Sequence, residues 1–285
     1  MRCWMAAAWG IVLAGSIASA QSINGRLKIV QETAMLKIGY RTDSRPFSFL
    51  DPQGRPTGYT IELCERIAKS LEHELHLSAL TIKWVPVDTR TRFEAIVDGS
   101  ADMECGSTTV SLSRMKAVDF SSLVYAESTG VLVKAGEGIF SFSDMAGRKI
   151  GVIPGSTNAQ AIRDQLERRR LDATLVEFRD REEGVAALAR GALDGFATDK
   201  HVLLALAQAA NLRNFVMLPE DLSFEPFAIM LPRGDWEFRL AVNTGLARIF
   251  RSGEVVELHS KYFGSFGREQ SNWVGAVLTF GGLPE

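Results

Sequence analysis

The chain has 285 residues, of which 46% are hydrophobic and 23% are charged, and its formal net charge is -2. This is the composition of an ordinary globular protein, and the length suits two domains. The small net charge gives no electrostatic reason to expect a nucleic-acid partner.

The N-terminus has the pattern of a secretory signal. Arg2 gives a positive start, residues 4–17 are almost wholly apolar, and Ala18-Ser19-Ala20 fits the small-residue cleavage rule. A membrane anchor is the rival interpretation, but the apolar run is short and no charged stop follows it. No cysteine lies at the cleavage point, so a lipid anchor is not indicated. We therefore predict a signal peptide over residues 1–20 and an exported, periplasmic mature chain.

Two cysteines, Cys64 and Cys105, remain once the signal carrying Cys3 is removed. An oxidising compartment permits a disulfide between them, but sequence alone cannot place their Cβ atoms within bonding range. We expect two buried free thiols instead. The chain has no CxxC motif and no Cys/His spacing typical of zinc sites, so no metal is predicted.

Strand and helix patterns alternate along most of the chain, which is typical of an α/β fold. The first series has expected strands at 35–40, 80–87 and 101–104 and helices at 61–75 and 90–97. The second has strands at 149–153, 175–178 and 193–197 and helices at 158–170, at 182–190 and from the last strand to 209. Extended segments at 123–134 and 224–231 lie between the modules, and helices at 236–251 and 254–262 precede a tail that follows Gly264.

The segment after the strand at 101–104 is the most informative one for function. Gly106 is followed by three hydroxyl residues, Ser107, Thr108 and Thr109, and then by Arg114. A guanidinium offers two parallel donors that match both oxygens of a carboxylate. Taken in isolation, the same residues could form an ordinary strand-to-helix turn with a hydroxyl cap.

Further polar residues follow the other expected strands, where open α/β sheets place their ligands. These residues are Arg41, Thr89, Arg92, Ser156, Thr157 and Asp199. Ser156 and Thr157 open a helix, whose first N–H groups lack intrahelical partners. The alternatives are ordinary ones: the arginines could be solvated surface groups, and Asp199 could simply cap the helix that follows it.

A series of short motifs, taken in order, carries a family resemblance. They are Pro46-Phe47-Ser48-Phe49, Gly54-Arg55-Pro56-Thr57-Gly58-Tyr59, Asp98-Gly99-Ser100-Ala101-Asp102, Ser113-Arg114, Asp119-Phe120-Ser121, Gly155-Ser156-Thr157, Gly191-Ala192-Leu193-Asp194-Gly195 with Asp199, and Lys261-Tyr262-Phe263-Gly264. From about residue 36 to 264 the chain resembles the extracytoplasmic solute-binding proteins for amino acids, family 3, which serve ABC importers. It looks most like the glutamate/aspartate-binding members, because of Gly39-Tyr40-Arg41, Thr89-Arg90-Thr91-Arg92 and Glu104-Cys105-Gly106-Ser107-Thr108-Thr109.

The resemblance implies a fold and a division of the chain. The fold is the two-lobed periplasmic-binding-protein fold of type II, in which each lobe is a mixed sheet flanked by helices and two hinge strands join the lobes. Lobe 1 is expected at 33–126 and 228–264, lobe 2 at 127–227, and a C-terminal tail at 265–285. Some relatives pair a cysteine at the position of Cys105 with one near Ala228, and Ala228 removes that partner here.

The resemblance also implies roles for individual residues. Arg114, Thr109 and the amide of Thr157 would hold the α-carboxylate of an amino acid, and Asp199 with Ser107 its ammonium. Arg41, Thr89 and Arg92 would hold a side-chain carboxylate. Acidic-ligand relatives have a histidine where this chain has Arg181, so Arg181 is expected to add a third positive group, and Phe47 is expected to stack on the ligand's carbon chain.

These roles predict a binding protein with no enzymatic activity and no cofactor. It would capture glutamate or aspartate as a monomer and deliver it to the permease of an ABC importer. The alternatives are a neutral or basic amino acid as ligand, or a dehydratase acting on prephenate or arogenate, which some proteins of this fold are.

Overall fold

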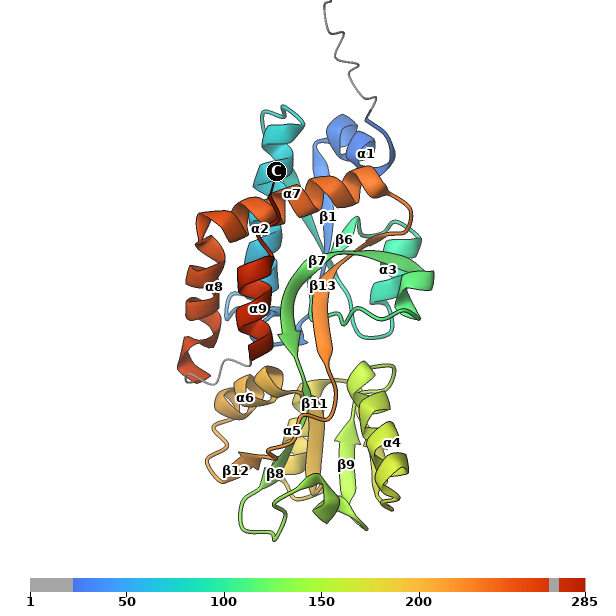
Figure 1. The fold of residues 1–285 in the computed structure, drawn as a ribbon, viewed down its shortest axis with the longest axis vertical. Coiled ribbons are helices and arrows are strands. Elements are labelled where there is room, and N and C mark those ends of the chain that lie inside the picture. The colour runs from blue at the N-terminus through green and yellow to red at the C-terminus, as the bar shows by residue number, and fades with distance from the viewer. Residues whose placement is uncertain (1–22, 267–271, 285) are drawn as a thin grey trace, which may run out of the picture.

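The computed structural model describes residues 23–266 and 272–284, so the predicted signal peptide at 1–20 lies outside the described residues. Two mixed sheets, each flanked by helices, lie one beyond the other along the long axis of the molecule (Figure 1). This confirms the predicted α/β class and two-lobed architecture. We call the two bodies lobe 1 and lobe 2; the residue limits predicted for them stay a prediction.

Lobe 1 is built on a sheet of five strands, of which β1, β5 and β6 are mutually parallel and β13 runs antiparallel to β6 and β7. In spatial order the strands are β5 (Thr81–Pro86), β1 (Met35–Tyr40), β6 (Met103–Glu104), β13 (Glu225–Pro232) and β7 (Val118–Glu127). Its helices are α1 (Gly25–Thr33), α2 (Tyr59–Glu74), α3 (Arg92–Val97), α7 (Trp236–Ser252) and α8 (Glu254–Phe263). A small antiparallel sheet, β2 (Asp43–Ser44), β3 (Ser48–Leu50) and β4 (Pro56–Thr57), follows β1.

Lobe 2 repeats the same plan with a second sheet of five strands. In spatial order these are β10 (Thr174–Glu177), β9 (Lys149–Val152), β11 (Gly195–Asp199), β8 (Thr129–Lys134) and β12 (Phe215–Met217). Strands β10, β9 and β11 are parallel, and β8 is antiparallel to both β11 and β12. Helices α4 (Thr157–Arg169), α5 (Arg181–Ala189) and α6 (Lys200–Ala209) surround the sheet. Three short 3-10 turns cover Arg114–Lys116, Phe142–Met145 and Gly264–Phe266.

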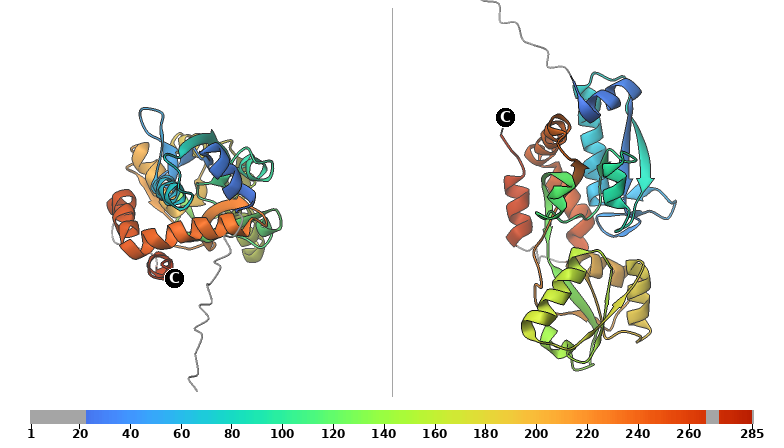
Figure 2. Two further views of the ribbon diagram at one scale, coloured as in Figure 1. Left: turned by 90° about the horizontal axis from the view of Figure 1, so that it is seen from above. Right: turned by 90° about the vertical axis from the view of Figure 1, so that its right-hand side faces the viewer.

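In the part of the chain that the structure describes, two segments connect the lobes, as the views in Figures 1 and 2 show. The extended segment predicted at 123–134 is two strands: β7 ends at Glu127 in the first sheet and β8 begins at Thr129 in the second. The segment predicted at 224–231 is β13, through which the chain returns from lobe 2 to lobe 1 alongside β7. The tail forms α9 (Asn272–Phe280), which packs against β7.

The helices form where apolar periodicity and capping residues coincide. The inward face of α2 carries Ile61, Cys64, Ile67 and Leu71, and all four are fully buried. Ser156 caps α4 by accepting a hydrogen bond from the amide of Ala159 at 3.0 Å, and Asp180 caps α5 in the same way. These caps fix where two of the lobe 2 helices begin.

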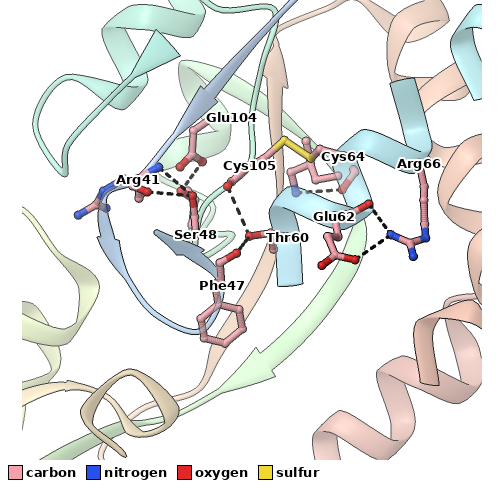
Figure 3. The surroundings of a disulfide bond; sticks show 12 residues. Arg41, Phe47, Ser48, Thr60, Glu62, Cys64, Arg66, Glu104 and Cys105 are labelled. Atoms are coloured by element: carbon pink, nitrogen blue, oxygen red, sulfur yellow. Dashed lines mark hydrogen bonds and ion pairs between the residues drawn. A yellow bond between two sulfur atoms is a disulfide. The ribbon is translucent and has the colours of Figure 1, made fainter. Parts of the chain in front are cut away.

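The prediction of free thiols at Cys64 and Cys105 is wrong. The two residues form a disulfide, with their Cα atoms 6.5 Å apart, which is within the range that a disulfide spans (Figure 3). Cys64 lies on the inward face of α2, which contacts β1, and Cys105 follows β6, the strand beside β1 in the sheet. The pairing depends on how the helix sits on the sheet, so the spacing of the cysteines in the sequence does not reveal it.

Candidate functional site

The residues predicted to bind a ligand meet where the two lobes face each other. Five of them follow the carboxyl end of a parallel strand: Arg41 after β1, Thr89 after β5, Ser107 after β6, Thr157 after β9, and Asp199 at the end of β11. Thr109 of lobe 1 and Thr157 of lobe 2 lie within hydrogen-bond distance, with 3.1 Å between their hydroxyl oxygens. The strand topology of each lobe therefore brings both sets of loops to the same interlobe boundary.

Arg41 and Arg92 are buried in lobe 1 without enough acceptors. Arg41 is 1% exposed and donates from one terminal nitrogen to Asp43 at 2.6 Å, and Arg92 is 4% exposed and donates to Thr108 at 2.7 Å. The Nε and Nη1 atoms of Arg41 and the Nε atom of Arg92 have no hydrogen-bond partner among the described residues. Burial lowers the pKa of both groups, that of Arg92 to about 9. The charge of Arg181 lowers the pKa of Arg41 further, and the charges of Arg41, Arg114 and Arg181 lower that of Arg92. An anion here would both offset the positive charge of the two arginines and supply the hydrogen-bond acceptors that they lack.

Glu104 stands beside these two arginines. Its Oε2 atom accepts a 2.6 Å hydrogen bond from Thr108, whereas Oε1 is buried and has no partner among the described residues. Gly106 makes room for this carboxylate, because a Cβ at that position would collide with Oε1. Figure 3 shows Glu104 next to Arg41, with the disulfide one residue further along the chain.

Arg114 is half-buried at the edge of the same group. Its Nη1 atom donates to the backbone carbonyl of Thr109 at 2.8 Å, and its guanidinium lies 5.2 Å from the ring centre of Phe93. Burial lowers the pKa of Arg114, and Glu225, Glu104 and Asp199 oppose that shift. This hydrogen bond holds the guanidinium of Arg114 beside Thr109, the residue predicted to bind the α-carboxylate together with Arg114.

Glu225, which the sequence analysis missed, joins the two lobes at this point. Its Oε2 atom accepts hydrogen bonds of 2.6 Å from the hydroxyls of both Thr109 and Thr157, and its Oε1 atom accepts one of 2.6 Å from Ser223. Each hydroxyl has a single proton to donate, so both threonine hydroxyls are committed to Glu225. What these threonines can still offer a ligand are hydroxyl lone pairs and backbone groups, including the first-turn amide of Thr157 at the start of α4.

Asp199 is buried in lobe 2 and held on both oxygens. Asn158 donates to its Oδ1 atom at 2.8 Å, and Nη2 of Arg181 lies 3.6 Å from its Oδ2 atom. Burial raises the pKa of Asp199 to about 7, with Glu225 and Glu127 adding to the shift and Arg181 opposing it. Its side chain makes no capping hydrogen bond to α6, so the simple N-cap alternative does not describe it. Ser107, its predicted companion, has a buried hydroxyl with no partner among the described residues.

Two other predicted residues have their side chains occupied by the protein. Phe47 is fully buried, and its ring packs against those of Tyr59, Tyr125, Phe227 and Phe263, so its stacking on a ligand stays a prediction. The guanidinium of Arg181 contacts Asp43, Ser44, Thr198 and Asp199. Thr89 is buried, and its methyl group lies 4.0 Å from where a Cβ of Gly155 would be, across the interlobe boundary.

The charge balance of this site differs from what the sequence suggested. The sequence pointed to several arginines and one carboxylate, Asp199. The structure places Asp43, Glu104 and Glu225 close by as well, so the arginines at 41, 92, 114 and 181 are matched by an equal number of carboxylates. No sequence pattern marked Asp43 and Glu225: Asp43 begins the two-residue strand β2, and Glu225 is the first residue of β13.

Residues 23–266 and 272–284 add neither a metal site nor a membrane-spanning helix. No group of three or more His, Cys, Asp or Glu side chains there is arranged to hold a metal ion. In the same described ranges, no helix combines the length and apolar character needed to cross a membrane. Surface cavities of about 400 to 590 Å³ are lined by residues other than those described above.

Two sheets linked by paired strands, with buried charged groups where the lobes face each other, define a two-lobed binding protein. The chain belongs to the bacterial extracellular solute-binding proteins, family 3, which residues 36–265 match. It is 29% identical over 246 residues to an L-glutamate/L-aspartate-binding protein of Pseudomonas aeruginosa, covering 86% of this chain and 82% of that protein. It is 26% identical to an ABC transporter glutamine-binding protein of Bacillus subtilis, covering 86% of this chain and 87% of that one.

A solved structure gives the same fold. The crystal structure of an ancestral amino acid-binding protein, a precursor of cyclohexadienyl dehydratase, superposes with a TM-score of 0.74 at 28% identity. The likeness covers 84% of this chain and 100% of that one.

Proposed function

We propose that this protein captures an acidic amino acid, glutamate or aspartate, outside the cytoplasmic membrane and delivers it to the permease of an ABC importer. The observation that carries the proposal is the set of buried guanidinium groups at Arg41 and Arg92 whose N–H donors lack acceptors. A buried donor without a partner costs about 1–3 kcal/mol, and more when it is charged. A ligand carboxylate between these arginines supplies both the missing acceptors and the opposite charge, which an aliphatic or cationic side chain does not.

The remaining roles follow from the geometry around that pair. Arg114 and the amide of Thr157 hold the α-carboxylate, and Thr109 supports Arg114 through its carbonyl group. Asp199 and the free hydroxyl of Ser107 hold the ammonium. Arg41 and Arg92, with Thr89 beside them, hold the side-chain carboxylate. The names of the relatives, which include both glutamate/aspartate-binding and glutamine-binding proteins, agree with an amino-acid ligand.

A thermal-shift screen with the twenty amino acids tests this proposal, because a ligand stabilises the folded protein in proportion to the logarithm of its concentration over its dissociation constant. We expect a rise in melting temperature confined to glutamate and aspartate. A rise with lysine, arginine or aliphatic amino acids, and none with the acidic ones, would contradict the proposal.

Glutamine is the second candidate, and one atom favours it. The buried Oε1 of Glu104 has no donor among the described residues, and the amide NH₂ of glutamine could supply one while its carbonyl oxygen accepts from an arginine. Calorimetry with glutamate and glutamine separates the two ligands. A turnover assay with prephenate separates both from the dehydratase alternative, for which we expect no product.

A further inference from the structure

Asp43 occupies an unusual place, between an arginine of each lobe. Its Oδ1 atom accepts from Arg41 of lobe 1 at 2.6 Å, and its Oδ2 atom accepts from Arg181 of lobe 2 at 3.3 Å. Asp43 is 7% exposed, and both arginines are more deeply buried than that. It therefore acts as a built-in counter-ion within the group of arginines that we propose for the ligand.

Arg181 has no donor nitrogen left over. Nε donates to the hydroxyl of Thr198 at 3.1 Å, and Nη1 donates to Ser44 at 3.0 Å as well as to Asp43. Nη2 forms an ion pair with Asp199 at 3.6 Å. Two of these partners belong to β11 of lobe 2 and two to β2 of lobe 1, so the guanidinium ties the lobes together across their boundary.

We propose that Asp43 is a specificity-determining residue: it holds Arg181 as a tie between the lobes and leaves only Arg41 and Arg92 for the ligand's side-chain carboxylate. This inference rests on the proposed function for the identity of the ligand. It gives Arg181 a different role from the direct ligand contact that the sequence predicts. It also gives Asp43 a role that no sequence motif indicated.

The charges support this division. Burial opposes ionisation of Asp43, but Arg181 and Arg41 outweigh it and hold the pKa at about 2, so the carboxylate is ionised at neutral pH. With Asp43 neutral, Arg41 and Arg181 would face each other uncompensated, and the site would attract an anionic side chain more strongly. The negative charge of Asp43 thus limits the preference for an acidic over an amide ligand. The contacts of Arg181 across the boundary favour the arrangement in which the two lobes are in contact, whichever ligand binds.

Calorimetry on Asp43→Asn and Arg181→Met, each with glutamate and glutamine, tests the proposal. For Asp43→Asn we expect the preference for glutamate over glutamine to rise about tenfold, which corresponds to about 1.4 kcal/mol. For Arg181→Met we expect both affinities to fall by the same factor, because a tie serves every ligand equally. An unchanged preference in Asp43→Asn, or a selective loss of glutamate in Arg181→Met, would overturn the proposal.

Two matched controls separate these effects from a general change of charge. Asp51→Asn removes an aspartate that pairs with Arg55 on the surface of lobe 1, and Arg179→Met removes an exposed arginine two residues before Arg181. We expect both controls to keep the wild-type affinities and preference. Circular dichroism on all four variants checks that each is folded before its binding is compared.

A second measurement does not depend on which ligand binds. Spin labels on Gln53→Cys in lobe 1 and Arg168→Cys in lobe 2, both exposed positions, report the distance between the lobes with no amino acid added. We expect Asp43→Asn and Arg181→Met each to shift the distances to longer values, and the double variant to shift them no further. Additive shifts would refute the tie even if the ligand proposal holds, and a failed ligand screen would leave this test intact.

Discussion

The two lobes bring different kinds of group to the boundary between them. In lobe 1, Arg41, Arg92, Glu104 and Ser107 each have a buried polar atom with no partner among the described residues. In lobe 2, Asp199, Asn158 and Arg181 are hydrogen-bonded or ion-paired on the side chains that face the boundary. In the function proposed above, lobe 1 therefore supplies groups that still lack a partner, whereas lobe 2 supplies groups already held by hydrogen bonds and ion pairs.

The largest expected effect comes from Arg114, on the lobe 1 side. Arg114→Ala leaves the ligand's α-carboxylate without its guanidinium, and removing one partner of a buried ion pair costs roughly 3–5 kcal/mol. We expect binding to weaken by at least about 100-fold in calorimetry, and Arg114→Lys to recover only part of it, because one ammonium does not replace the fork. Unchanged affinity in Arg114→Ala would remove this residue from the site.

The disulfide supports the lobe 1 side only, which makes it a test of stability. Replacing Cys64 and Cys105 together by serine opens a loop with a sequence separation of 41 residues. We expect the free energy of unfolding to fall by about 3 kcal/mol, measured by urea denaturation under non-reducing conditions. The reduced wild type is the matched comparison and should lose a similar amount; equal stability of all three forms would speak against a structural disulfide.

The contribution of lobe 2 should appear in the pH dependence of ligand affinity. Because the pKa of Asp199 is raised to about 7, its carboxyl group is protonated below that pH. The proton then competes with the ligand's ammonium for this carboxylate. We expect affinity to fall by up to about tenfold per pH unit below 7 and to level off above it. Glutarate, which has no amino group, should not show this loss in the same titration.

The sign of the effect on stability is opposite. A raised carboxyl pKa means that the folded protein binds its proton more tightly than the unfolded chain, so stability falls as pH rises from about 4 to about 7. Thermal unfolding without ligand should follow that slope. A melting temperature that rises across this range in wild type but not in Asp199→Asn would contradict the assignment.

The smallest expected effect is that of Asn158 on the pH dependence set by Asp199. Asn158 donates to Asp199, and this hydrogen bond stabilises the ionised form. Asn158→Ala should therefore move the midpoint of the pH dependence upward by about one unit, since a hydrogen bond to a charged group contributes about 1.5 kcal/mol or more. Binding titrations at pH 6, 7 and 8 on the variant and on wild type give that midpoint.

Much of the fold was predictable because its signals are local. The strands at 35–40 and 149–153 and the helix on which Cys64 lies are fixed by apolar periodicity and by capping residues such as Ser156. The disulfide was not predictable, because it depends on how α2 is seated against the end of β6. The strands of the small sheet, two or three residues each, and helix α9 leave too weak a periodicity to be recognised.

Predicting the site met a similar limit. Residues that follow strand ends, such as Arg41 and Asp199, could be named from the strand pattern, and the structure brings them to one boundary. Asp43 and Glu225 could not, because what makes them part of the site is contact with residues far away in the sequence, Arg181 and Thr109. Sequence reasoning thus named residues that lie at this boundary, but it missed the two carboxylates that contact them.

The four arginines at the boundary have four carboxylates nearby, and this balance of charge has a consequence for how a ligand arrives. Opposite charges held a few ångströms apart largely cancel each other's field at larger distances. Physiological salt screens what remains beyond the Debye length of about 8 Å. For the acidic ligand proposed above, we expect encounter to be governed by diffusion rather than by long-range attraction, with a rate that depends little on ionic strength. Selectivity arises only after contact, when the lobes meet and water is excluded from the charges between them.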